Sequence, residues 1–320
     1  MPLDYQVFDA GNVRLQRGET LRDCKLAYKT FGKMNPARDN VIVYPTWYSG
    51  QHYDNEWLIG PCMALDPDKY FIIIPNMIGN GLSSSPSNMP APYNGARFPR
   101  VTACDNVRLQ HRLVTEKFFV KRLALAQAGR WARCRRSIGA RSIPTWLSAS
   151  RRFAARPNAR ATISCSSKAS RRRSPATSPI TAAGTRNSPP RGLRAMARVY
   201  AGWGFSQAFY RERLDIERMG YSSLEDFLVA FWEGFFLPKD ANNLLTMLWT
   251  WQNGDISDNE LYNGDFKKAL DARPDRPLLP AGGQSIRGSQ HVEREISART
   301  LDLGPFRRRT RTTSSSSTRR

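Results

Sequence analysis

The chain has 320 residues, of which 40% are hydrophobic, and its 49 Lys and Arg against 27 Asp and Glu give a net charge of +22. This length suits one large domain, or a domain with an inserted lid, and no apolar run is long enough to span a bilayer. Because there is no signal-peptide pattern and the five cysteines form no CxxC pair, we expect unpaired thiols in a cytoplasmic protein.

Residues 1–126 alternate strand and helix signals. Strands are predicted at 25–31, at the apolar runs 41–44 and 71–74, and at 123–126, with a helix at 105–119. Alternation of this kind indicates an α/β protein with a mostly parallel, doubly wound sheet. In such sheets the active site lies beyond the carboxyl ends of the strands.

Residues 127–190 have a different composition. They contain thirteen Arg and one Lys but no Asp or Glu, and they lack helical or strand periodicity. Residues 305–320 add six Arg and no acid, so the other 240 residues carry a net charge of only +2. Since few aromatic residues interleave with these arginines, nucleic-acid binding is the weaker explanation of the charge.

Residues 191–264 are predicted to form a helical lid. Helices are expected at 193–201, 223–236 and 241–251, and Ser222 with Glu225 suits a capping box for the second of them. The Trp, Phe and Leu side chains of these helices would either line a small-molecule pocket or form an ordinary helix-packing core. Residues 265–320 are expected to be a degraded C-terminal part of the core.

Five stretches resemble the homoserine O-acetyltransferase family of α/β-hydrolases. They are LAYKTFG at 26–32, PTWYSG at 45–50, NGLSSSPSN at 80–88, RGLRAMAR at 191–198 and ANNLL at 241–245. The resemblance covers residues 1–126 and 190–271. It implies an α/β-hydrolase fold with an inserted helical lid.

The resemblance also implies an activity. Family members transfer an acetyl group from acetyl-CoA to the hydroxyl of homoserine through a serine acyl-enzyme. Acetyl-CoA would be a co-substrate, with no bound cofactor or metal, and the partner would be a small-molecule substrate rather than a membrane. Relatives are often dimers, so a homodimer is one assembly to consider. A simple esterase of the same fold is the alternative activity.

The catalytic triad implied by the family is not intact in this sequence. The nucleophilic serine should follow the strand at 123–126 in a G-W-S-M-G elbow, with an Asp and a His near the C-terminus. The chain reads Q-A-G-R-W-A at 127–132, so Gly129 and Arg130 occupy the place at which the elbow serine is expected. No Gly-x-Ser-x-Gly occurs anywhere in the sequence. We therefore predict a catalytically inactive chain.

A shifted reading frame offers an explanation. If each residue is read from the third base of one codon and the first two bases of the next, residues 127–132 permit Gly-Trp-Ser-Met-Gly. The same offset permits family-like segments at 141–149, 161–172 and 310–320, and GC-rich DNA read out of frame commonly yields Arg, Ala, Ser and Pro. We predict frame-shifted segments at 127–189 and 271–320, arising in the gene or from a sequencing error.

Other residues match parts of the family's site. Thr46 and Trp47 match the loop whose backbone N–H would supply half of an oxyanion hole. Arg198 and Tyr210 occupy positions at which the resemblance implies substrate-facing lid residues, the alternative being helix-surface packing.

The three histidines are weaker candidates. His291 is the one histidine in the C-terminal third and so the one stand-in for a catalytic base, but its neighbours do not resemble the family's Gly-His motif. His52 and His111 are expected to be structural or solvated. A sheet that loses its later strands would also expose apolar edges, so misfolding is a further expectation.

Overall fold

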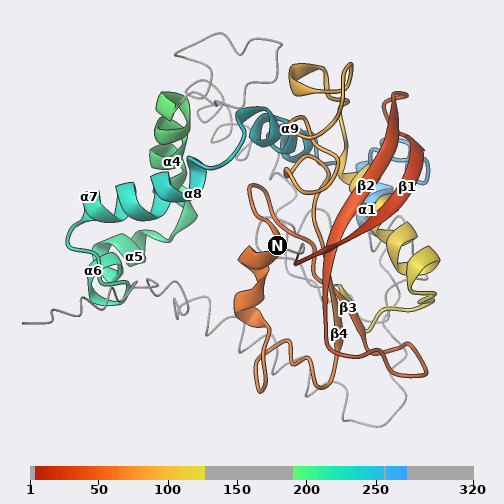
Figure 1. Ribbon diagram of the computed structural model, residues 1–320, viewed down its shortest axis with the longest axis horizontal. Helices are drawn as coiled ribbons and strands as arrows, with labels where there is room; N and C mark the ends of the chain where they lie inside the picture. Colours follow the sequence, from red (N-terminus) through yellow and green to blue (C-terminus); the bar gives the residue numbers. More distant parts are fainter. Residues whose placement is uncertain (1–3, 127–189, 256, 272–320) are drawn as a thin grey trace, which may run out of the picture.

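The computed structural model describes residues 4–126, 190–255 and 257–271 (Figure 1). Its strands are β1 (Gln6–Arg14), β2 (Thr20–Phe31), β3 (Val41–Val43), β4 (Phe71–Pro75) and β5 (Leu125–Ala126). They form one sheet in the order β1-β2-β4-β3-β5. β3 pairs in parallel with β4 and with β5, whereas β1–β2 and β2–β4 are antiparallel. The described sheet is therefore mixed, and β1 is a strand that the sequence pattern did not predict.

The centre of the sheet is buried on both faces, which explains the continuous apolar runs of β3 and β4. Successive side chains of a strand point to opposite faces. Val41, Val43 and Ile73 accordingly pack into one apolar cluster with α1. Ile42 and Ile72 pack into a second cluster on the other face. Burying each of these side chains stabilises the fold by about 1.5–3 kcal/mol.

The predicted helix at 105–119 is observed as α1 (Ala103–Arg112) followed by a π-helical turn, η3 (Leu113–Lys117). It begins two residues earlier than predicted because Thr102 caps it. The Thr102 side chain accepts from the Asp105 N–H at 3.1 Å, and the Thr102 N–H donates to the Asp105 carboxylate at 2.9 Å. It ends before Phe119, whose backbone is left-handed (φ +54°) and whose side chain is exposed.

The second half of the described chain is helical. The helices are α4 (Pro190–Gly204), α5 (Gln207–Arg211), α6 (Leu214–Glu217), α7 (Leu224–Phe227), the π-helical turn η4 (Leu228–Glu233), α8 (Gly234–Phe236), α9 (Ala241–Gln252) and α10 (Phe266–Asp271). The three predicted helices are confirmed, and α5, α6 and α10 were not predicted. α7 begins one residue later than expected, because Ser223 rather than Ser222 accepts the capping hydrogen bond, from the Asp226 N–H at 3.1 Å.

α4 to α8 form a helical unit to one side of the sheet, and α9 lies between this unit and the strands (Figure 1). α9 contacts the core directly. Asn243 exchanges two hydrogen bonds with Ser87, at 2.8 and 3.1 Å, and the Thr250 hydroxyl donates to the Val101 carbonyl at 2.6 Å. The aromatic residues of the helices form one buried cluster, which also contains Tyr48 from the sheet side.

Two short 3₁₀ helices, η1 (His52–Leu58) and η2 (Gly95–Arg97), lie in the loops after β3 and β4. Among the described cysteines, Cys24, Cys62 and Cys104 are free thiols, as predicted. No helix in the described ranges combines the length and the apolar composition that crossing a bilayer requires. The predictions for 127–189 and 272–320 lie outside the described residues.

Candidate active site

The loop that follows β3 lies at the sheet edge where an active site is expected. β3 and β5 are parallel neighbours, with Val43 paired to Ala126, so their carboxyl ends meet at one edge. The loop 45–50 leaves β3 at this edge, and the predicted nucleophile elbow would leave β5 there. Gly129 and Arg130 themselves lie outside the described residues.

Thr46 and Trp47 play different parts in this loop. The Thr46 N–H donates to the Pro75 carbonyl at 3.2 Å, and its buried hydroxyl accepts from the Met77 N–H at 3.1 Å. These bonds hold the end of β3 against the end of β4, so the Thr46 N–H is already engaged. Among the described residues, the Trp47 N–H has no acceptor. Of the two predicted oxyanion-loop residues, Trp47 is therefore the one whose donor is open.

The loop conformation is held by several specific contacts. The Asn55 side-chain amide donates to the Tyr44 carbonyl at 3.1 Å, and the Gly50 N–H donates to the Trp47 carbonyl at 3.1 Å. Ser49 has a left-handed backbone with φ +63°. A Cβ at Gly50 would lie 2.8 Å from the Trp47 indole, so glycine is required for the ring to lie against the loop. The donors are thus fixed in place before any ligand arrives.

Tyr48 points into a buried aromatic group beneath the helices. Its ring centroid lies 6.2 Å from that of Tyr200 on α4 and 5.5 Å from that of Trp251 on α9. Burial, with Tyr200 as the lesser cause, raises the pKa of Tyr48 well above its usual range. Burial also raises the pKa of Tyr200. Tyr48 is therefore a protonated hydrogen-bond donor across the physiological pH range.

Hydrogen bonds from the loop after β4 hold the neighbouring loops at this edge of the sheet in place. The Asn76 side-chain carbonyl accepts from the His52 N–H at 3.1 Å and from the Asn80 amide at 2.9 Å. The Ser83 hydroxyl accepts from the Ala27 N–H at 3.0 Å, which satisfies part of the β2 edge beyond the end of β4. The NGLSSSPSN stretch therefore has a structural role in fixing the loops of the candidate site.

His52 is buried beside Asp4, with its Nε2 atom 3.2 Å from the carboxylate. The Asn76 amide nitrogen lies 3.3 Å from Nδ1, and because that amide donates, we assign the ring proton to Nε2. Hydrogen bonds from His52 and then Lys29 lower the pKa of Asp4. Of the two roles predicted for His52, this environment is the structural one.

Asp4, His52 and Glu56 are the one group of described side chains close enough together to hold a metal ion. The Lys29 ammonium, however, lies 3.1 Å from the Asp4 carboxylate and 2.7 Å from that of Glu56. Because the ammonium already pairs with both carboxylates, this arrangement is better explained as an ion-pair cluster. His111 lies half-buried in the last turn of α1, where burial lowers its pKa, and His291 lies outside the described residues.

Arg198 and Tyr210 make contacts within the helical unit. The Arg198 guanidinium donates to Glu233 at 2.8 Å and also pairs with Glu225. Glu225, and then Glu233, raise the pKa of Arg198 through these bonds. The Tyr210 hydroxyl donates to the Ala201 carbonyl at 2.6 Å. Contact of either residue with a substrate stays a prediction.

Comparisons with known proteins extend over most of the chain, although no protein-family profile matches it. The chain is 36% identical over 276 residues to the ethyl acetate hydrolase of Pseudomonas veronii, covering 83% of this chain and 76% of the relative. It is 35% identical to the homoserine O-acetyltransferase of Methanohalophilus mahii over 130 residues, covering 35% of this chain and 27% of the relative.

Solved structures of esterases and of a homoserine O-acetyltransferase are also similar to this chain. The acetyl esterase MekB superposes with a TM-score of 0.73 at 33% identity, covering 84% of this chain and 78% of that one. A homoserine O-acetyltransferase from Bacillus anthracis superposes with a TM-score of 0.62 at 17% identity, covering 91% and 88%, which establishes a shared fold alone.

The fold and the long match to the hydrolase place this chain in the α/β-hydrolase superfamily, to which it belongs. Within the superfamily it is similar to acetyl-ester hydrolases over most of its length, and to homoserine O-acetyltransferases over about a third. The predicted fold class is confirmed. The family resemblance is refined, because esterases match over a longer stretch than acetyltransferases.

Proposed function

We propose that this chain derives from a hydrolase of short acetyl esters, rather than from a homoserine acetyltransferase. The observation that carries the proposal is the 36% identity to an ethyl acetate hydrolase over 83% of the chain. The loop after β3 is consistent with it, since an open backbone donor and a buried aromatic group suit a small ester.

The chemistry of such a hydrolase has two steps. A serine hydroxyl, its proton taken by a histidine, adds to the ester carbonyl and gives a tetrahedral oxyanion. The oxyanion then collapses, the histidine returns the proton to the departing alcohol, and an acetyl-serine is left. Water then attacks the acetyl-serine and releases acetate. In this chain the Trp47 N–H would stabilise the oxyanion, and one such donor lowers the barrier by about 2.7–4 kcal/mol.

We further propose that the chain as encoded binds such esters but does not turn them over. The sequence has no Gly-x-Ser-x-Gly elbow, and a donor without a nucleophile cannot form the acyl-enzyme. A shifted reading frame at 127–189 and 271–320 remains our explanation for the missing serine. Nucleic-acid binding gains no support from the relatives.

The direct test measures release of p-nitrophenol from p-nitrophenyl acetate. The encoded chain should match the buffer rate. A gene restored to one family-like frame should hydrolyse the ester and should not form O-acetylhomoserine from acetyl-CoA and homoserine. Turnover by the encoded chain that a serine-reactive phosphonate abolishes would overturn the proposed inactivity. Preferential acetylation of homoserine by the restored chain would favour the transferase instead.

Nucleotide sequencing across codons 126–191 and 270–320 tests the frame shift separately. An uninterrupted family-like frame would locate the error in the recorded sequence, and the cellular protein would then be an intact enzyme. If sequencing instead confirms the shifted frame over both segments, the chain is a true inactive relative.

A further inference from the structure

The Tyr48 hydroxyl is a buried donor without a partner. Tyr48 is 4% exposed, and its Oη atom has no hydrogen-bond partner among the described residues. Other tyrosines of the fold are satisfied, since Tyr28 donates to the Gln6 side chain at 2.7 Å and Tyr210 donates to the Ala201 carbonyl at 2.6 Å. A buried hydroxyl left unsatisfied destabilises the free protein, so its presence needs an explanation.

The surroundings of this hydroxyl indicate what would satisfy it. Trp47 and Tyr48 are consecutive residues of one loop, and each presents a donor that lacks an acceptor in the described chain. The Tyr200 and Trp251 rings lie beside Tyr48. Ser49, the next residue, is held in a left-handed conformation, and such strain persists where the surrounding structure imposes it. Donors without acceptors on two consecutive residues, one of them beside aromatic rings, match a small ligand that has oxygen acceptors and a short apolar body.

We infer that Tyr48 is a specificity-determining residue, whose hydroxyl donates to an oxygen of a short ester while the Tyr200 and Trp251 rings limit the length of its chain. The inference rests on the proposed function and assigns the recognition of the ester to a side chain of the loop after β3. It requires no bond to be made or broken, so it can be tested on the inactive chain.

The test measures binding and stability on the full-length chain. Ethyl acetate and ethyl hexanoate are titrated against wild type, Tyr48→Phe and Tyr28→Phe, with saturation-transfer NMR to obtain Kd. Tyr28→Phe is the matched control because it removes a buried hydroxyl that has a partner. Tyr48→Phe should weaken ethyl acetate binding about tenfold, the effect of losing one good hydrogen bond, while Tyr28→Phe should leave it unchanged. Ethyl hexanoate should bind wild type more weakly than ethyl acetate.

Thermal unfolding separates a ligand-binding role from a structural one. Tyr48→Phe should raise Tm because it removes an unsatisfied group, whereas Tyr28→Phe should lower Tm because it leaves the Gln6 carbonyl without its donor. A wild-type Kd for Tyr48→Phe, or a fall in Tm like that of Tyr28→Phe, would overturn the inference and leave the proposed function standing. Wild-type chain that binds neither ester would overturn both.

Discussion

Some turns of this fold require glycine, because the backbone of another segment lies where a Cβ atom would be. Gly32 ends β2 with φ +77°, and a Cβ there would lie 2.2 Å from the Tyr70 carbonyl oxygen and 2.4 Å from that of Pro67. Gly18, in the β1–β2 turn, has φ +90° but nothing within 4 Å of the same point. Substituting each glycine by alanine therefore distinguishes the destabilisation caused by a steric clash from that caused by a left-handed backbone alone.

We predict that Gly32→Ala lowers the free energy of unfolding by about 3 kcal/mol or more, because the carbonyls of two chain segments would have to move. Gly18→Ala should cost only about 1 kcal/mol, the strain of φ alone. Urea unfolding followed by circular dichroism measures both. Equal losses for the two variants would contradict the role given to the contacts of Gly32.

The described cysteines differ in burial, which predicts their reactivity. Burial is the main cause that raises the pKa of Cys24 to about 12 and that of Cys104 to about 11, whereas Cys62 is exposed. Because the thiolate is the nucleophile, iodoacetamide at pH 8 should label Cys62 and spare Cys24 and Cys104 in the folded chain. Peptide mass spectrometry measures this, and the chain in urea, where all three should react, is the control.

The same raised pKa values predict a pH dependence of stability. An unfolded thiol ionises near pH 9, while these two folded thiols stay protonated to about pH 11 and 12. The unfolded state therefore loses protons first, and the free energy of unfolding should fall as pH rises above 9. Urea midpoints at pH 8 and pH 10.5 check this, with Cys24→Ala expected to reduce the difference.

At the scale of elements, a buried carboxylate on η4 connects two helices of the helical unit through ion pairs. The Glu233 side chain is 7% exposed and lies 2.8 Å from Arg198 and 3.4 Å from Arg194, so η4 is tied to α4. Glu225 pairs with the same Arg198, but its own side chain is 63% exposed. Water screens exposed ion pairs, so the two glutamates should contribute unequally although they share a partner.

We predict that Glu233→Ala lowers the free energy of unfolding by about 1–2 kcal/mol, because it removes a hydrogen-bonded buried carboxylate that two arginines contact. Glu225→Ala should cause no measurable change. Chemical denaturation of both variants, repeated in 0.5 M salt, is the measurement. A larger loss for Glu225→Ala would show that the exposed pair, not the buried one, joins the helices.

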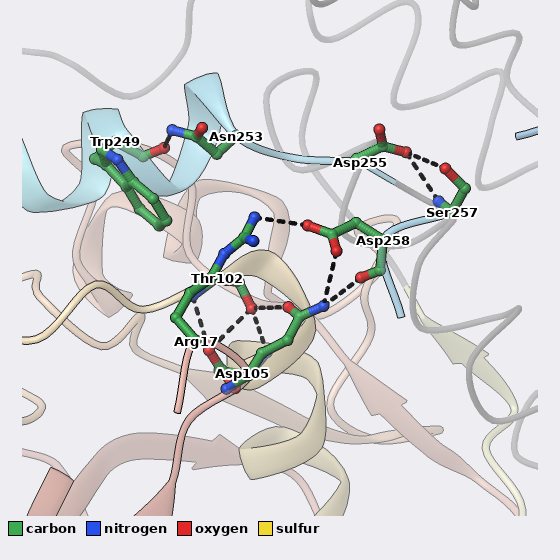
Figure 2. A network of polar contacts seen from close by, with 9 residues as sticks. Arg17, Thr102, Asp105, Trp249, Asn253, Asp255, Ser257 and Asp258 are labelled. Atoms are coloured by element: carbon green, nitrogen blue, oxygen red, sulfur yellow. Dashed lines mark hydrogen bonds and ion pairs between the residues drawn. The ribbon is translucent and has the colours of Figure 1, made fainter. Parts of the chain in front are cut away.

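At the scale of the molecule, one polar network joins segments that are far apart in the chain (Figure 2). Thr102 donates to the Gln16 side-chain carbonyl at 2.6 Å, the Gln16 N–H donates to Asp105 at 2.8 Å, and the Gln16 amide donates to the Asp258 carbonyl. Arg17 reaches the Asp258 carboxylate at 2.8 Å, with both side chains largely exposed. The β1–β2 turn, the start of α1 and the segment after α9 thus meet at one point.

We predict that Gln16→Ala lowers the free energy of unfolding by about 1–2 kcal/mol, since it removes the hydrogen bonds of the Gln16 side chain to the Thr102 hydroxyl and to the Asp258 carbonyl. Arg17→Ala, which removes only a screened pair, should cost less than about 0.5 kcal/mol. Hydrogen exchange of α1 and α9 amides should increase together in Gln16→Ala. An increase in one helix alone would contradict the network's role in joining them.

The sequence by itself determined the features that depend on local chemistry. The runs of β3 and β4 are apolar because both faces are buried, and the helices after residue 190 follow from spacing along one segment. The helix at 105–119 was also found from its spacing, but its Thr102 cap was missed and its start was placed two residues late. The α/β-hydrolase resemblance and the absent serine motif were also readable, because a nucleophile elbow is a short contiguous pattern. β1 was missed because only one of its nine residues is fully buried, which leaves no alternating apolar signal.

The tertiary structure alone decided which groups of the candidate site are free to act. Thr46 and Trp47 are equivalent as sequence, but Pro75 engages one N–H and leaves the other open. Tyr48 has no partner only because α4 and α9, about 150 to 200 residues away in the chain, cover it without offering an acceptor. Whether a buried donor finds an acceptor depends on segments that are distant in the chain and close in space. A local sequence pattern cannot predict which segments these are.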